Sequence, residues 1–170
     1  QRWQTWHKVM GSIYCVPMSI EATPPTLDAN ACERWQRQGH GSWLHEEIGL
    51  RMQERLQWMR MVPTMWLDWF PLNGGLQVHQ RVRERYPEAR VHIHETNAAR
   101  RAQALHQLRG SWWQRFVRRD RLQMSEPPQG QVNMLWANMA LHLSPEPQAL
   151  LKQWQQALAV DGFVMFSLSL

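Results

Sequence analysis

The stretch from Trp66 to Gly75 constrains the fold of this chain more than any other part of the sequence. A short apolar run, residues 65–69, leads into a turn, and Gly74 and Gly75 open a helical pattern that ends at Pro87. A strand, a loop and a helix in this order form half of a parallel α/β unit. Glycines in such a loop let backbone N–H groups approach a bound cofactor. The stretch therefore predicts an α/β domain with a cofactor loop at this position.

The rest of the pattern alternates between strands and helices. A helix is expected before the loop, over residues 43–61, with Glu46 and Glu47 in its first turn. Further strands are predicted over residues 89–95, 132–137 and 163–170, with a weaker one near 116–119. Further helices are predicted over residues 97–108 and from Pro145, where Ser144 provides the cap. A turn is expected after that last helix, at Asp161 and Gly162. This alternation favours an α/β fold with a doubly wound, mostly parallel sheet. The pattern ends after its fifth strand, so the core is expected to be truncated there.

Length and composition suit a single globular domain. A length of 170 residues is enough for one domain with its own core, plus a short appendage. Prolines interrupt residues 1–40, which are expected to form an irregular extension, and residues 41–170 are expected to form the α/β domain. No apolar run reaches the roughly 18 residues of a membrane span, and no targeting signal opens the chain. Cys15 and Cys32 are expected to be free thiols in a reducing, cytoplasmic compartment.

Positive charge is concentrated in one segment. The formal net charge is +5, but residues 81–121 alone carry eleven arginines against four acidic residues, a local charge of +7. An arginine-rich face attracts polyanions such as nucleic acid, phosphates or an acidic protein. A solvated helix surface explains the same composition without a partner, so both interpretations stay open.

Two segments in the second half carry a resemblance to a known family. Residues 132–142, VNMLWANMALH, resemble the fourth strand and following loop of class I S-adenosylmethionine-dependent methyltransferases. Residues 151–167 resemble the helix, turn and fifth strand that come next. Upstream, residues 43–60 are similar to the N-terminal helix of malonyl-acyl-carrier-protein methyltransferases of biotin synthesis. The resemblance covers about residues 30–170 and implies a Rossmann-like fold, S-adenosylmethionine as cofactor and a substrate carboxylate as methyl acceptor.

The resemblance also implies five contacts with the cofactor or substrate. Asp68 matches the acid of the first motif, and Gly74 matches the last glycine of the loop. Glu95 matches the acid that holds the ribose hydroxyls, a role that suits a carboxylate because it can accept hydrogen bonds from both hydroxyls. Asp120 falls where the family places an acid near the adenine amino group. Asn138 lies in the loop that faces the methyl donor or the substrate. Three of them have an ordinary alternative: Asp68 as a cap or local pair, Glu95 as a solvated strand end and Asp120 as an ion pair with neighbouring arginines.

The loop departs from the pattern of the family. Phe70 and Leu72 replace two glycines, and Pro71 removes a backbone donor. Glycine serves in such loops because it allows positive φ and close backbone approach. Asn133 also stands where the fourth strand usually carries an acid. The sequence therefore leaves two functional classes open: a methyltransferase, or a non-catalytic relative that uses the fold as a scaffold or partner-binding module.

The resemblance gives the basic segment a candidate partner. An acidic carrier protein, or its phosphopantetheine arm, would suit Arg81, Arg83 and Arg85. An RNA-binding methyltransferase is a third interpretation, which rests on the basic segment alone.

Three other patterns have weaker functional interpretations. His92 and His94 share one strand face beside Glu95, but no third ligand is obvious, so packed or solvated histidines are favoured over a metal site. His142 is a candidate general base or a polar loop residue. The eleven tryptophans are expected to pack in the core rather than form a ligand cage.

Overall fold

The computed structural model describes residues 43–108, 122–123 and 129–168, together with Asp28, Asn30, Ala31 and Arg34. In chain order, the elements within the three ranges are α2 (Trp43–Glu54), the 3₁₀ turn η1 (Arg55–Trp58), β1 (Met65–Trp69), α3 (Pro71–Gly74), α4 (Leu76–Arg85), β2 (Arg90–His94), α5 (Ala98–Leu108), β3 (Leu122–Gln123), β4 (Val132–Ala137), η2 (Leu141–Leu143), α7 (Pro147–Ala157) and β5 (Leu158–Phe166). The cysteines, residues 1–27 and the weak strand predicted near 116–119 lie outside the described residues.

The strands form one parallel sheet in the order β3-β2-β1-β4-β5. Strand β1 is central, since Trp66 lies opposite Val91 of β2 on one side and Met134 of β4 on the other. Strands β2 and β3 lie on one side of β1, and β4 and β5 lie on the other, so the strand order reverses between β1 and β4. Parallel sheets of this kind bind ligands beyond the carboxyl ends of the strands at that reversal. The predicted α/β class and doubly wound sheet are confirmed.

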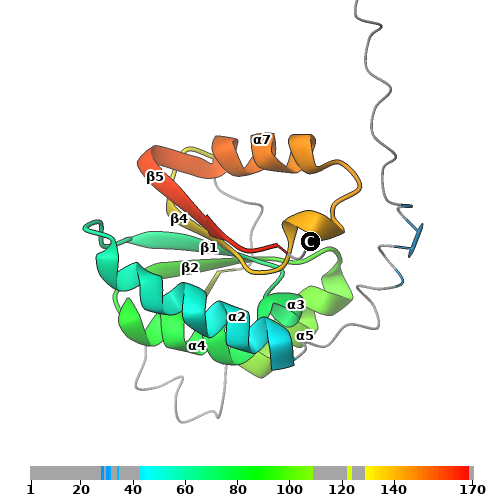
Figure 1. Cartoon of the computed structure of the whole chain (residues 1–170), viewed down its shortest axis with the longest axis horizontal. Coiled ribbons are helices and arrows are strands. Elements are labelled where there is room, and N and C mark those ends of the chain that lie inside the picture. Colours follow the sequence, from blue (N-terminus) through cyan, green and yellow to red (C-terminus); the bar gives the residue numbers. More distant parts are fainter. Residues whose placement is uncertain are drawn as a thin grey trace, which may run out of the picture.

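Helices cover both faces of the sheet (Figure 1). Trp66 and Trp136 face α2, α4 and α5 and pack with Val78 of α4. Leu67 follows Trp66 and Leu135 precedes Trp136, so these two side chains point to the opposite face. They pack with Leu150 and Trp154 of α7. This alternation follows from the two-residue period of a strand, and each large buried side chain contributes about 2 kcal/mol.

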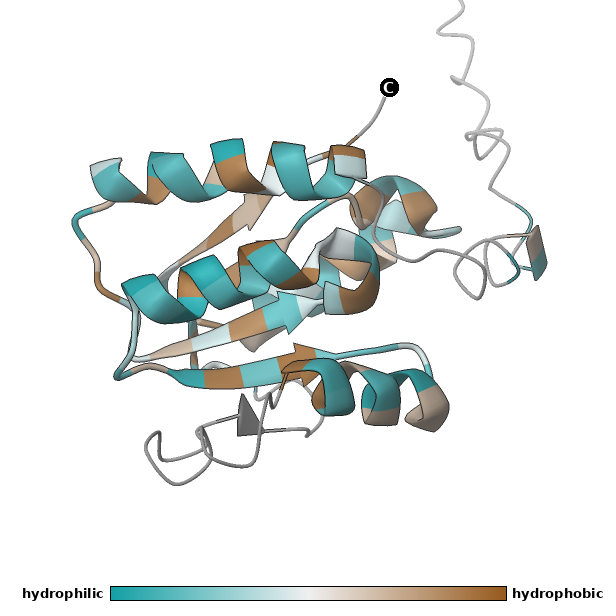
Figure 2. Cartoon of the chain, turned by 90° about the horizontal axis from the view of Figure 1, so that it is seen from below, coloured by the Kyte–Doolittle hydropathy of each residue, from teal (hydrophilic) through white to brown (hydrophobic). Residues whose placement is uncertain are grey.

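The hydropathy of the helices agrees with this layered arrangement. Hydrophilic and hydrophobic residues alternate along the helices, as expected for helices that bury one side (Figure 2). Tryptophans 66, 69, 136 and 154 are buried, as the sequence predicted, whereas Trp43 and Trp58 are each 77% exposed. None of the helices in the described ranges is long and apolar enough to cross a membrane.

Two predicted helix boundaries were wrong. The helix expected over residues 43–61 ends at Glu54, and η1 then leads to an extended Met59. The last helix begins at Pro147 rather than Pro145. Proline suits this position too, because the N–H groups of the first helical turn have no partner within the helix. Ser144 does not cap that helix, because its Oγ accepts the N–H of Glu146 in a local turn.

The expected turn at Asp161 and Gly162 lies inside β5. Leu158 lies opposite Val132 and Phe163 opposite Met134, so extra residues of β5 bulge out between these two pairs. Asp161 has φ 64 in this bulge. A Cβ on Gly162 would lie 2.8 Å from the carbonyl oxygen of Val132, so the close approach requires glycine. The strand expected over residues 163–170 therefore begins earlier, at Leu158, and ends at Phe166.

Candidate functional site

The loop after β1 keeps a glycine-type backbone while carrying a large side chain. Phe70 has φ 61 and ψ 57, in the left-handed region, at a position where the resemblance expects glycine. Its carbonyl oxygen accepts the N–H groups of Asn73 and Gly74 at 3.0 and 2.8 Å. These bonds form the short helix α3, with Pro71 at its first position. Gly75, with φ 116, then separates α3 from α4, so the two glycines end one helix and precede the next.

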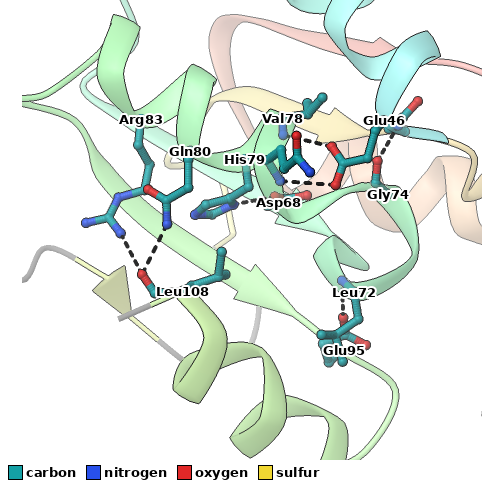
Figure 3. Close-up of polar contacts among 12 residues, drawn as sticks. Glu46, Asp68, Leu72, Gly74, Val78, His79, Gln80, Arg83, Glu95 and Leu108 are labelled. Atoms are coloured by element: carbon teal, nitrogen blue, oxygen red, sulfur yellow. Dashed lines mark hydrogen bonds and ion pairs between the residues drawn. The ribbon is translucent and has the colours of Figure 1, made fainter. Parts of the chain in front are cut away.

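Glu95 lies directly after β2 and is held under this loop. Its Oε1 accepts the backbone N–H of Leu72 at 3.0 Å (Figure 3), and its Oε2 accepts Nε of Arg100 at 3.0 Å. The side chain of Glu95 is 0% exposed and that of Arg100 is 10% exposed. Burial raises the pKa of Glu95 above its ordinary value, while the Leu72 N–H and Arg100 act in the opposite direction. Arg100 also donates from its Nη2 to Oδ1 of Asn73.

Asn138 and Gly74, both predicted to contact the cofactor or the substrate, lie in contact with each other. The Asn138 amide donates to the carbonyl oxygen of His45 at 2.7 Å and to that of Gly74. Its Oδ1 accepts the hydroxyl of Ser167 at 2.6 Å. A Cβ on Gly74 would lie 3.2 Å from the carbonyl oxygen of Asn138, so this approach favours glycine. The loop after β1 is thereby tied to the loop after β4 and to the end of β5.

Helix α2 supplies two contacts that the sequence did not reveal. The carboxylate of Glu46 accepts the N–H groups of Gln77 and Val78 at 3.1 and 3.0 Å (Figure 3). Nδ1 of His45 donates to the carbonyl oxygen of Asn73 at 2.6 Å. Glu46 lies in the first turn of α2, as the sequence predicted, and its carboxylate also caps α4. The available signal was Gly75, which precedes α4 and has no side chain with which to cap it.

Asp68 faces α4 rather than the loop that holds Glu95. Its Oδ2 accepts Nδ1 of His79 at 2.6 Å, and both side chains are almost fully buried. Burial raises the pKa of Asp68, and His79 opposes that rise. The ring of His79 also packs on Trp66, with ring centroids 5.1 Å apart. Sequence reasoning identified Asp68 and missed its partner, because the pair joins a strand to the next helix.

Asn133 and Asp120 complete the predicted positions. Oδ1 of Asn133 accepts the N–H of Thr64, the hydroxyl of Thr64 and the N–H of Met65, at 3.1, 2.8 and 3.1 Å. In place of an acid, this position thus fastens the start of β1 to β4. Asp120 lies outside the described residues.

The histidines near these strand ends are packed. His94 stacks on Trp69 with ring centroids 3.8 Å apart, and burial, helped by Arg101, lowers the pKa of His94 to about 4. Burial also lowers the pKa of His92, with a smaller contribution from Arg90. His142, in η2, has a pKa lowered by burial and by His45. In the part of the chain that the structure describes, no three histidine, cysteine or acidic side chains could hold a metal ion together.

The three arginines of α4 differ in their surroundings. Arg81 and Arg85 are exposed, and Nη1 of Arg81 lies 3.8 Å from Oε2 of Glu84. Arg83 is half-buried and donates to the carbonyl oxygen of Leu108 at 3.5 Å (Figure 3). The outer side of α4 therefore presents positive charge to solvent.

The chain is similar to a known methyltransferase. No protein-family model matches the chain. The chain is 32% identical over 134 residues to the malonyl-[acyl-carrier protein] O-methyltransferase of Laribacter hongkongensis (strain HLHK9), a match that covers 73% of this chain and 43% of that protein. The chain thus spans less than half the length of this relative. Together with the parallel sheet, this similarity suggests a methyltransferase family and supports a methyltransferase-like function.

Proposed function

We propose that this chain binds S-adenosylmethionine at the carboxyl ends of β1, β2 and β4, and that it methylates a carboxylate of an acyl-carrier-protein-bound substrate in biotin synthesis. The observation that carries the proposal is Glu95, an acid at the end of the strand next to β1 in a Rossmann-like sheet. Gly74 and Asn138, in contact across the point where the strand order reverses, support the same position. The proposal includes the cytoplasmic location predicted from the sequence.

The chemistry of this reaction asks little of the protein as an acid or base. When bound, the cofactor supplies an electrophilic methyl group on a sulfonium. A substrate carboxylate is already ionised at neutral pH, so its oxygen needs no general base. The contribution of the chain is to align donor and acceptor and to exclude water. Residues 71–75, all buried and tied to Asn138 and His45, suit that role.

The closed arrangement of the loop fits the cofactor only in part. The position of Glu95 suits a ribose, yet its side chain is fully buried and both of its oxygens accept hydrogen bonds from the chain. Phe70 and Leu72 add side chains where close approach favours glycine. These observations favour a second candidate function, a non-catalytic scaffold or partner-binding protein with the same fold.

Calorimetric titration with S-adenosylhomocysteine separates the two functions. We expect micromolar binding to the full chain, and about tenfold to hundredfold weaker binding for Glu95→Gln, because a hydroxyl bonds more strongly to a charged acceptor than to a neutral amide. Glu84→Gln, an exposed change of the same chemistry on α4, should bind like the unaltered chain. Absence of heat at millimolar ligand would establish the scaffold in place of the enzyme.

The exposed charge of α4 supports a partner for the same function. We propose that an acidic carrier protein docks on Arg81, Arg83 and Arg85, because complementary charge speeds association and orients partners. An RNA-binding methyltransferase is the weaker alternative, since only charge favours it.

A further inference from the structure

The carboxylate of Glu95 is the most enclosed charged group beside the loop after β1. Its side chain is 0% exposed, and its two oxygens accept the Leu72 N–H and Nε of Arg100, each at 3.0 Å. A ribose that bonded to Glu95 through both hydroxyls would need direct access to this carboxylate. The folded arrangement gives that position to the protein's own donors.

Arg100 is well anchored in this position. Its backbone N–H donates to Oδ1 of Asn97 at 2.9 Å, which fixes the first turn of α5. Its guanidinium donates from Nε to Glu95 and from Nη2 to Asn73 in the loop. The planar, forked guanidinium can make both contacts at once, which the single ammonium of lysine cannot reproduce.

Arg100 is also the partner of this ion pair that lies nearer to solvent. Its side chain is 10% exposed, whereas that of Glu95 is 0% exposed. The other contact of the carboxylate comes from the backbone of Leu72, which is held in α3. Movement of the arginine side chain is therefore a shorter route to an open carboxylate than movement of the loop.

We infer that Arg100 is a gate on the ribose subsite, competing with the hydroxyls of the adenosyl ligand for the carboxylate of Glu95. The inference rests on the proposed function and adds a residue that sets the affinity of that site. In the closed state the guanidinium holds Glu95, and the ligand binds once the guanidinium has moved outward. The observed affinity is then the intrinsic affinity reduced by the fraction of molecules in the open state.

Removing the guanidinium tests the gate. In calorimetric titrations of the full chain with S-adenosylhomocysteine, Arg100→Gln should bind about tenfold more tightly than the unaltered chain if about one molecule in ten is open. Arg101→Gln removes the same charge from the next residue of α5 and should leave the affinity unchanged. Circular dichroism of each variant establishes that the fold is retained.

The outcomes separate the gate from the proposed function. If the unaltered chain binds and Arg100→Gln binds equally or more weakly, Arg100 supports the site and the gate is wrong, while the proposed function stands. If both proteins are folded and neither binds, the proposed function fails and the gate fails with it.

A conservative variant covers the case in which Arg100→Gln does not fold, since loss of one partner of a buried ion pair is strongly destabilising. Arg100→Lys keeps a positive charge beside Glu95 and loses the fork that also reaches Asn73. It should bind S-adenosylhomocysteine more tightly than the unaltered chain. Unchanged or weaker binding by the folded lysine variant would overturn the gate.

Discussion

At the scale of single residues, Phe70 holds a left-handed conformation in the loop after β1. Its φ of 61 lies in a region that costs a non-glycine residue about 1–2 kcal/mol. The conformation persists because its carbonyl oxygen accepts two N–H groups of α3 and its own N–H donates to the carbonyl oxygen of His94 at 2.9 Å. The sequence identified the substitution, but the geometry that tolerates it depends on β2, a separate strand.

His94 gives the residue scale a pH-dependent prediction. A pKa lowered from 6.5 to about 4 means that the folded state favours the neutral ring. The unfolded chain therefore binds more protons between these values, so the free energy of unfolding is largest above pH 6.5 and falls as the pH drops toward 4. The shift corresponds to a loss of at most about 3 kcal/mol in the free energy of unfolding, and partial exposure of the ring makes that loss smaller.

Replacing the ring isolates this effect. His94→Phe keeps an aromatic ring for stacking on Trp69 and should lose less stability than the unaltered chain between pH 7 and pH 4.5, measured by urea denaturation. His106→Phe, at an exposed position of α5, serves as the control and should follow the unaltered chain. Equal pH dependence in the unaltered chain and His94→Phe would show that His94 is not the titrating group.

At the scale of elements, α4 joins the loop to the charged surface. Its first turn is capped by Glu46 of α2, which contributes about 1 kcal/mol in such positions. A Cβ on Gly75 would lie 2.7 Å from Oε2 of Glu46, so the glycine and the cap depend on each other. The alternation of strands and helices was predictable from local pattern. This cap was not, because it joins residues that are 31 positions apart in the chain.

The outer side of α4 gives the prediction for a carrier partner. Arg81→Glu with Arg85→Glu should weaken binding of an acidic carrier protein about tenfold at low salt, because both side chains are exposed and add to the attraction. Arg83 is left in place because it bonds to Leu108. Arg55→Glu, on η1, is the control and should have a smaller effect. Surface plasmon resonance at two salt concentrations measures both, and an unchanged affinity in the double variant would contradict docking on α4.

Helix and strand boundaries show the limit of local pattern. Pro145 and Pro147 both satisfy the rule for a first helical position, and the structure uses the second. Asp161 and Gly162 have the composition of a turn but lie in a bulge of β5, where Gly162 approaches Val132 of β4. In both cases contacts with distant residues select between local alternatives that the sequence alone leaves nearly equal.

For the whole molecule, the α/β class and the parallel sheet follow from the sequence, because short apolar runs separated by helices form parallel crossovers. The candidate site follows only in part. Gly74 and Asn138, two of the predicted contact residues, lie against each other, and Glu95 lies beneath the same loop. The sequence did not predict the bond between Arg100 and Glu95. The two residues lie five positions apart, on either side of the turn from β2 to α5, and local pattern does not show which way the guanidinium points.

The location of ligand binding tests the central claim, that an adenosyl cofactor binds beyond the carboxyl ends of β1, β2 and β4. The measurement is a map of backbone amide chemical shifts in the full chain as S-adenosylhomocysteine is added. A cofactor at this position should cause the largest changes at Leu72, Gly74, Glu95 and Asn138, with little change along the outer side of α7. Saturable changes confined to other residues, or none at millimolar ligand, would contradict it.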